Sequence, residues 1–174
     1  NSTKYGAQGA ETSVYYTAST NEVYVCVKNV YLGKVASIDA ATKTEDRKIN
    51  ITGVGSASAA IVANGADSFE TENFARKDYV VFTAASTDNG ATYAVKSAVA
   101  AEKVSGEFTA YKGSDNVTVG GTVYKIGAKA AHTGATYESS VGALKDIVDL
   151  YLDANKNVLE IDTAEAADAN YAYV

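Results

Sequence analysis

Apolar and polar residues alternate in three stretches of the chain that share one plan. These stretches are VYYTASTNEVYV (14–25), VVFTAASTDNGATYAV (80–95) and DLYLDANKNVLEI (149–161). Each contains an apolar run, a small polar turn and a second alternating run. A period of two places successive side chains on opposite faces of a strand. Each stretch therefore predicts a β-hairpin.

The residues that follow the first two hairpins also recur. YLGKVASID (31–39) aligns with VSGEFTAYK (104–112), KINITGVG (48–55) with NVTVGGTVY (116–124), and KDYVVF (77–82) with KDIVDLY (145–151). Several ordered matches at a nearly constant offset indicate a duplicated unit.

Each copy of the unit is expected to hold four strands and a variable middle with a helical turn. The strands are predicted near 33–39, 48–53, 78–84 and 92–99 in the first copy, and near 105–112, 116–126, 147–152 and 157–163 in the second. The sequence therefore predicts an all-β fold with short helical turns. It would contain two tandem β-barrel-like or β-sandwich-like repeats plus an N-terminal hairpin. A repeat of about 70 residues is marginal for an independent core, so the copies are expected to pack together or share strands.

The predicted boundaries are a lead-in hairpin over 1–30, a first repeat over 31–103 and a second over 104–174. The hairpin is either the closing hairpin of a preceding unit or a lead-in to the first repeat. DANYAYV (168–174) reads as the opening of another strand. We therefore expect a segment of a longer array, or a subunit that exchanges strands with its neighbours.

Composition supports the β prediction and restricts the partners. Val and Ile far outnumber Leu, and Tyr occurs 13 times, a bias that suits pleated sheets. A net charge of −6 disfavours nucleic acid and anionic membrane surfaces, which attract clustered Lys and Arg. The chain contains no apolar run of about 18 residues, so no insertion into a membrane is expected.

Residues 106–126 (GEFTAYKGSDNVTVGGTVYKI) and 149–174 resemble repeats of S-layer-like surface proteins of Gram-positive, clostridial-type bacteria, which also carry S-layer homology modules. The resemblance covers most of the chain from about Tyr31 onward. It rests on the patterns V-x-G-x-x-Y and Y-x-D-x-x-x-x-V. It implies an extracellular location, at the cell surface or in the cell wall, and a structural role. It brings no catalytic residues.

The turn of the last hairpin contains the one candidate metal site. Asp153, Asn155 and Asn157 imitate the D-x-N-x-N start of a calcium loop. Val158 and Ala164 stand where an EF-hand requires Gly and Glu. The sequence leaves open a bound calcium ion or an Asx turn, in which these side chains bond the local backbone. No other cofactor is expected.

The single histidine and the single cysteine are the next candidates for catalytic residues. His132 lies among Ala, Gly and Thr, a setting typical of an exposed loop. Cys26 lies in an alternating strand, where we expect a buried and inert thiol. Neither has a catalytic partner nearby in the sequence, and the chain is expected not to be an enzyme. An acid-pair hydrolase stays open, because folding alone could bring two carboxylates together.

Two functions follow from these observations. The first is a structural module of an extracellular surface protein, an S-layer-like array or filament subunit that assembles through β-edge contacts. The absence of Pro, which commonly blunts exposed strand edges, favours this function. Its partners would be other copies or neighbouring repeats. The alternative is an adhesin or glycan-binding module, whose Tyr-rich sheet faces would bind a cell-wall or host glycan.

Overall fold

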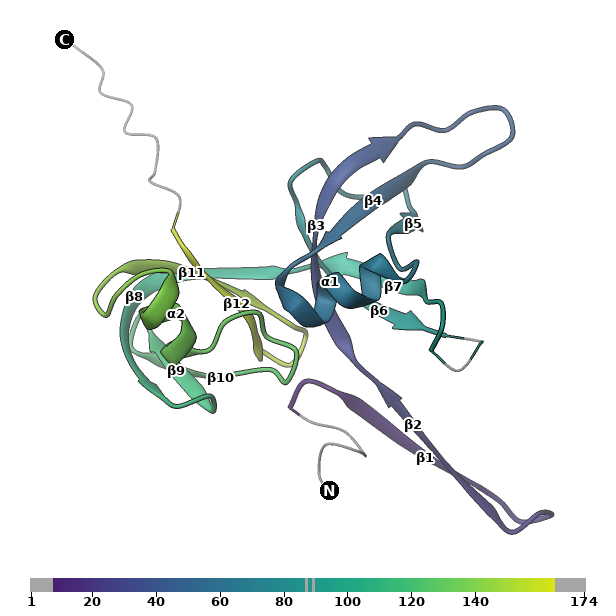
Figure 1. Ribbon diagram of the computed structural model, residues 1–174, viewed down its shortest axis with the longest axis horizontal. Helices are drawn as coiled ribbons and strands as arrows, with labels where there is room; N and C mark the ends of the chain where they lie inside the picture. The colour runs from purple at the N-terminus through teal and green to yellow at the C-terminus, as the bar shows by residue number, and fades with distance from the viewer. Residues whose placement is uncertain (1–7, 87, 89, 165–174) are drawn as a thin grey trace.

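The computed structural model describes residues 8–86, 88 and 90–164, which form two five-stranded antiparallel sheets and a separate two-stranded hairpin (Figure 1). The strands are β1 (Glu11–Thr17), β2 (Glu22–Lys28), β3 (Val30–Asp39), β4 (Lys48–Gly53), β5 (Ser68–Glu70), β6 (Tyr79–Ala85), β7 (Ala94–Ala100), β8 (Glu102–Lys112), β9 (Asn116–Val119), β10 (Thr122–Lys125), β11 (Ile147–Leu152) and β12 (Val158–Thr163). The helices are α1 (Gly55–Ala63) and α2 (Gly134–Ser140). The all-β prediction is confirmed.

The two sheets have corresponding topologies. Unit 1 (30–100) has the strand order β5-β4-β3-β6-β7, and unit 2 (102–163) has the order β10-β9-β8-β11-β12. The central ladder joins β3 to β6 with Gly33 opposite Val80, and β8 to β11 with Gly106 opposite Val148. Strands β3, β4, β6 and β7 therefore correspond to β8, β9, β11 and β12. The fifth strand differs, because β5 follows its helix and β10 precedes its helix.

The strand predicted over 116–126 is instead a hairpin, β9–β10. Gly120 and Gly121 between the two strands both have positive φ, 56° and 78°. Two successive residues with positive φ form the tight turn that best fits the twist of antiparallel strands. The chain therefore reverses at these glycines, and the second half of the segment pairs back on the first.

Each unit buries its own apolar core against one face of its sheet. In unit 1 the core includes Val35, Ile49 and Phe82, and α1 packs against β4. In unit 2 the core includes Phe108 and Tyr137 of α2, whose rings meet edge to face at 5.4 Å between centroids. Edge strands approach each other as well: β5 contacts β7, and Ile126 bridges Val158. The edges of each sheet therefore lie near one another, and one of the sheets is nearly barrel-like.

A third apolar cluster joins the two units. It contains Leu32 and Val81 of unit 1 and Tyr151 and Leu159 of unit 2. Leu32 lies opposite Val81, on the face of the sheet that points away from the core of unit 1. The ring of Tyr79 stacks on that of Tyr151 with centroids 3.8 Å apart. Unit 2 therefore covers the part of this second face that holds Leu32 and Val81.

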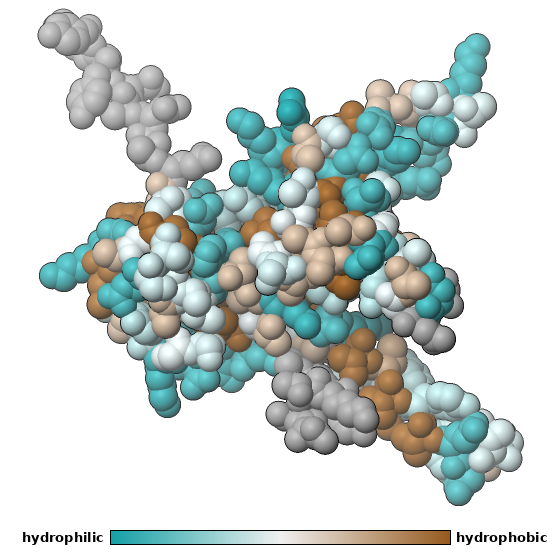
Figure 2. Space-filling model, in the orientation of Figure 1, coloured by the Kyte–Doolittle hydropathy of each residue, from teal (hydrophilic) through white to brown (hydrophobic). Residues whose placement is uncertain are grey.

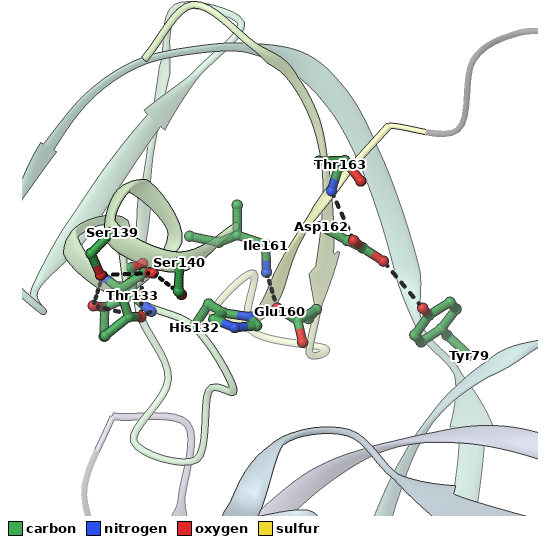
Figure 3. Close-up of polar contacts among 10 residues, drawn as sticks. Tyr79, His132, Thr133, Ser139, Ser140, Glu160, Ile161, Asp162 and Thr163 are labelled. Atoms are coloured by element: carbon green, nitrogen blue, oxygen red, sulfur yellow. Dashed lines mark hydrogen bonds and ion pairs between the residues drawn. The ribbon is translucent and has the colours of Figure 1, made fainter. Parts of the chain in front are cut away.

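Polar contacts reinforce this junction between the units. The Tyr79 hydroxyl donates a hydrogen bond to Asp162 Oδ2 over 3.5 Å, and Figure 3 shows the two side chains pointing toward one another. Burial raises the pKa of the Tyr151 hydroxyl, so this group stays neutral in the junction.

The substitution Leu32→Ala tests whether the junction stabilises the fold. Leu32 is fully buried, so its truncation is expected to lower the free energy of unfolding by about 2–5 kcal/mol. Leu144→Ala is the matched control, because Leu144 is 40% exposed and its loss should change stability by about 0.5 kcal/mol or less. Urea denaturation measures both values. Equal stability of the two variants would show that the junction contributes nothing.

Candidate functional site

The β1–β2 hairpin stands outside both sheets and exposes an apolar face. Val14 lies opposite Val25 and Tyr16 opposite Val23, so these four side chains share one face. Val14 is 64% exposed, Tyr16 62% and Val23 61%. Figure 2 shows hydrophobic residues gathered along this projecting ribbon. A two-stranded hairpin alone is marginally stable in water and usually needs another element packed on its apolar face. The exposed apolar face of this hairpin is therefore unusual.

The pairing registers show which place the hairpin has in the repeat. Gly33 and Gly106 are corresponding residues of the two units. Val25 lies the same number of residues before Gly33 as Ala98 lies before Gly106, so Val25 corresponds to Ala98. Their partners across the two hairpins are Val14 and Phe82. Val14 therefore takes the place of Phe82. The three similar stretches in the sequence match Val14 with Val80 instead, two residues away and on the same face.

Residues at this place are buried in both complete units. Phe82 and its counterpart in unit 2, Leu150, are both fully buried, whereas Val14 is 64% exposed. In the complete units, β6 pairs with both β3 and β7, and β11 with both β8 and β12. Within the described residues, β1 pairs only with β2. By this correspondence the hairpin has the register of a closing hairpin, and no strand of the described residues pairs with the outer edge of β1.

The opposite face of the hairpin is also uncovered. Tyr15 and Tyr24 lie directly across from each other and are 58% and 54% exposed. The Tyr24 hydroxyl donates to Glu22 Oε2 at 2.6 Å, which lowers the pKa of the Glu22 carboxyl and raises that of the tyrosine. Cys26 on this face is exposed, so the expectation of a buried thiol is wrong. The alternation of the strand is as predicted, but no element among the described residues covers either face.

The structure places Asp153, Asn155 and Asn157 together in the turn between β11 and β12. Asp153 Oδ1 accepts hydrogen bonds from the backbone N–H groups of Asn155 and Asn157, both at 2.8 Å. The Asn157 side-chain amide donates to Asp153 Oδ2 at 2.9 Å. These bonds form an Asx turn, and they engage lone pairs that a cation would use. In the described part of the chain, no group of three or more His, Cys, Asp or Glu side chains could hold a metal ion. Calcium binding stays a prediction.

A histidine–carboxylate pair is the one arrangement with catalytic chemistry that the sequence did not reveal. His132 Nδ1 lies 2.6 Å from Oε1 of Glu160, a buried residue on β12 (Figure 3). The two residues are distant in the sequence, and Glu160 stands in an alternating strand, so no local pattern signals the contact. Burial raises the pKa of the Glu160 carboxyl.

This pair lacks an aligned nucleophile in the part of the chain that the structure describes. A triad needs a hydroxyl or thiol within hydrogen-bond reach of the second ring nitrogen. The one hydrogen bond of the His132 ring among the described residues is to Glu160. The hydroxyls of Ser139 and Ser140 donate instead to the Thr136 carbonyl oxygen. The pair thus ties the segment before α2 to β12.

The substitution Glu160→Gln tests the buried carboxyl. Because the pKa of Glu160 is raised on folding, its favourable contribution is present below the ordinary value of 4.5 and is lost as pH rises through the raised value. The wild-type protein should therefore lose stability with rising pH in that range, and the variant should lose less. Thermal melts across this pH range measure the difference. Glu107→Gln at an exposed site is the control, and parallel profiles for all three proteins would contradict the prediction.

Comparisons with protein-family models, with curated proteins and with solved structures give no match to this chain. Neither α1 nor α2, the helices of the described residues, has the length and apolar character needed to cross a membrane. The geometry of the hairpin and of the two units is therefore the basis for a functional proposal.

Proposed function

We propose that the chain is a non-enzymatic structural module of a bacterial extracellular surface protein, an S-layer-like array or filament subunit that assembles through β-edge contacts. The observation that carries this proposal is the exposure of Val14, at a place where Phe82 and Leu150 are fully buried. A contiguous exposed apolar face marks a surface that another protein segment covers.

The open edge of β1 supports the same proposal. An unpaired strand edge offers a row of backbone N–H and C=O groups to an added strand. The added strand would satisfy these groups, and its side chains would shield the apolar face beside them. The extracellular setting is supported by the resemblance of residues 106–126 and 149–174 to surface-protein repeats.

The substitution Val23→Lys tests assembly through the apolar face of the hairpin. Burial of an unpaired lysine is costly, so self-association is expected to weaken by about tenfold or more. Val123→Lys is the control, because Val123 of β10 is 62% exposed and Val23 is 61% exposed. Sedimentation velocity over a wide range of concentrations measures association. A wild-type protein that stays monomeric throughout would refute the proposed function.

The exposed pair of Tyr15 and Tyr24 favours the alternative, a glycan-binding module. Two tyrosine rings on one open face, with the Glu22 carboxylate beside them, offer a flat amphipathic surface and hydrogen-bond acceptors. This face differs from the apolar face that supports assembly. The two functions can therefore be separated by substitutions on opposite sides of one strand.

A glycan array with the wild-type protein distinguishes the two functions. A purely structural module is expected to bind no glycan. Binding that Tyr15→Ala abolishes and Val14→Ala retains would instead support the adhesin, because Val14 lies on the other face of β1.

A further inference from the structure

Strands β7 and β12 correspond, and β7 is followed by β8. The residues that follow β12 therefore correspond in sequence position to β8. The Ala164 N–H donates to the Ile147 carbonyl oxygen at 3.1 Å, and the Ala101 N–H donates to the Tyr79 carbonyl oxygen at 3.0 Å. Tyr79 and Ile147 begin the corresponding strands β6 and β11. Ala164 therefore corresponds to Ala101, the residue just before β8. Residues 165–174, which include the predicted strand DANYAYV, lie outside the described residues, and only their sequence enters the argument.

The sequence of residues 165–174 keeps the pattern of β8. Glu165 corresponds to Glu102, Ala169 to Gly106 and Tyr171 to Phe108. Phe108 is fully buried, and a Cβ added at Gly106 would lie 3.0 Å from the backbone nitrogen of Gly120. The segment thus repeats an aromatic residue at the place of the buried Phe108 and has alanine, the next smallest residue, at the place of Gly106.

The hairpin and this segment are complementary parts of one unit. The β1–β2 hairpin corresponds to the closing hairpin of a unit, and among the described residues no first strand pairs with β1. The sequence of residues 165–174 corresponds to that of a first strand. We propose that residues 165–174 of one copy of the chain add as an antiparallel strand to the open edge of β1 in a second copy. This inference rests on the proposed function and names the partner segment.

The registers of the two complete units fix the alignment of the added strand. Tyr31 lies opposite Phe82, and Val104 lies opposite Leu150. Val14 corresponds to Phe82 and Leu150, and Ala167 corresponds to Val104. Ala167 of one copy therefore lies opposite Val14 of the other.

The hydrogen bonds of the complete units also show which backbone groups would join the two copies. The Val35 N–H donates to the Asp78 carbonyl oxygen at 2.8 Å, and the Phe108 N–H donates to the Asp146 carbonyl oxygen at 2.9 Å. Every second N–H of the first strand faces the third strand. Ala167, Ala169 and Tyr171 are each an even number of residues from the counterpart of Phe108. In the added strand their N–H groups would therefore face β1, and the N–H of Ala166 would face away.

The donor must be a second copy, because a chain cannot reach its own hairpin in this register. The alignment places Ala164 beside the outer end of β1, near Thr17. In its own chain, Ala164 is held at Ile147 in unit 2. Figure 1 shows the end of β12 and the outer end of the hairpin on opposite sides of the molecule. A contact between the C-terminal segment of one copy and the hairpin of the next is heterologous, so repetition builds a filament, or a ring where the rotation between copies closes.

Full-length proline variants test the added strand. Ala167→Pro removes an N–H that faces β1, and is expected to weaken self-association by about tenfold or more. Ala166→Pro is the matched control one residue away, and should associate as the wild type does. Val14→Pro removes the corresponding N–H on the open edge of β1 and should weaken association to the same extent.

Mixing the blocked copies gives the sharpest result. Ala167→Pro leaves the hairpin free, and Val14→Pro leaves the C-terminal segment free. Each variant alone should be monomeric in sedimentation velocity, and an equimolar mixture should form dimers but nothing larger. Association of Ala167→Pro at the wild-type level, or a mixture that stays monomeric, would overturn the inference.

Cysteine cross-linking checks the register in a Cys26→Ser background, independently of the proline variants. Ala167→Cys with Val14→Cys places two thiols opposite each other, within the Cα spacing that a disulfide spans. Mild oxidation should give a ladder of cross-linked copies. Ala167→Cys with Tyr15→Cys is the control, because these side chains point to opposite faces. Equal cross-linking of both pairs, or a bridge within one chain, would refute the register.

Association of the wild type and of the two variants distinguishes a failure of this inference from a failure of the proposed function. A wild-type chain that is monomeric at every concentration refutes both. A chain whose association is weakened by Val23→Lys, but not by Ala167→Pro, assembles through the hairpin face with another partner surface, and then only the strand addition is wrong.

Discussion

The central ladder between the first and third strands of each unit is the constraint on which the structure depends. It sets Gly33 opposite Val80 and Gly106 opposite Val148, and so decides which face of each sheet meets the core. A Cβ added at Gly33 would lie 2.3 Å from Ile51 Cγ2, so only glycine allows β3 to pack this closely. The third strand is buried where the ladder is present. In the β1–β2 hairpin no described strand forms it, and Val14 stays exposed.

The same ladder makes the units depend on one another. Because side chains alternate along a strand, β3 and β6 direct Leu32 and Val81 away from the core that they help to form. These residues are buried in a cluster that Tyr151 and Leu159 of unit 2 complete. A sheet with apolar residues on its second face needs another element to bury them, and here unit 2 takes that place.

The buried carboxylates act within this framework. Asp149 is 3% exposed in its side chain, lies 2.6 Å from the Lys103 ammonium and accepts a hydrogen bond from Ser105, so it joins β11 to β8. Glu160 joins β12 to the segment before α2 through His132. Each of these two carboxylates thus contacts a side chain of another segment.

The sequence by itself determined most of the strands and the all-β class, because alternation is a local property that fixes which side chains share a face. It did not predict β5 or the division of 116–126 into β9 and β10. Even the hairpin was found from its pattern. Only the tertiary structure decided what covers each face: Cys26 and Phe82 both occupy alternating strands, yet one is exposed and the other fully buried. The pairing of His132 with Glu160 was likewise beyond the sequence. Covering elements and long-range partners come from distant segments, whose approach depends on packing that no local pattern encodes.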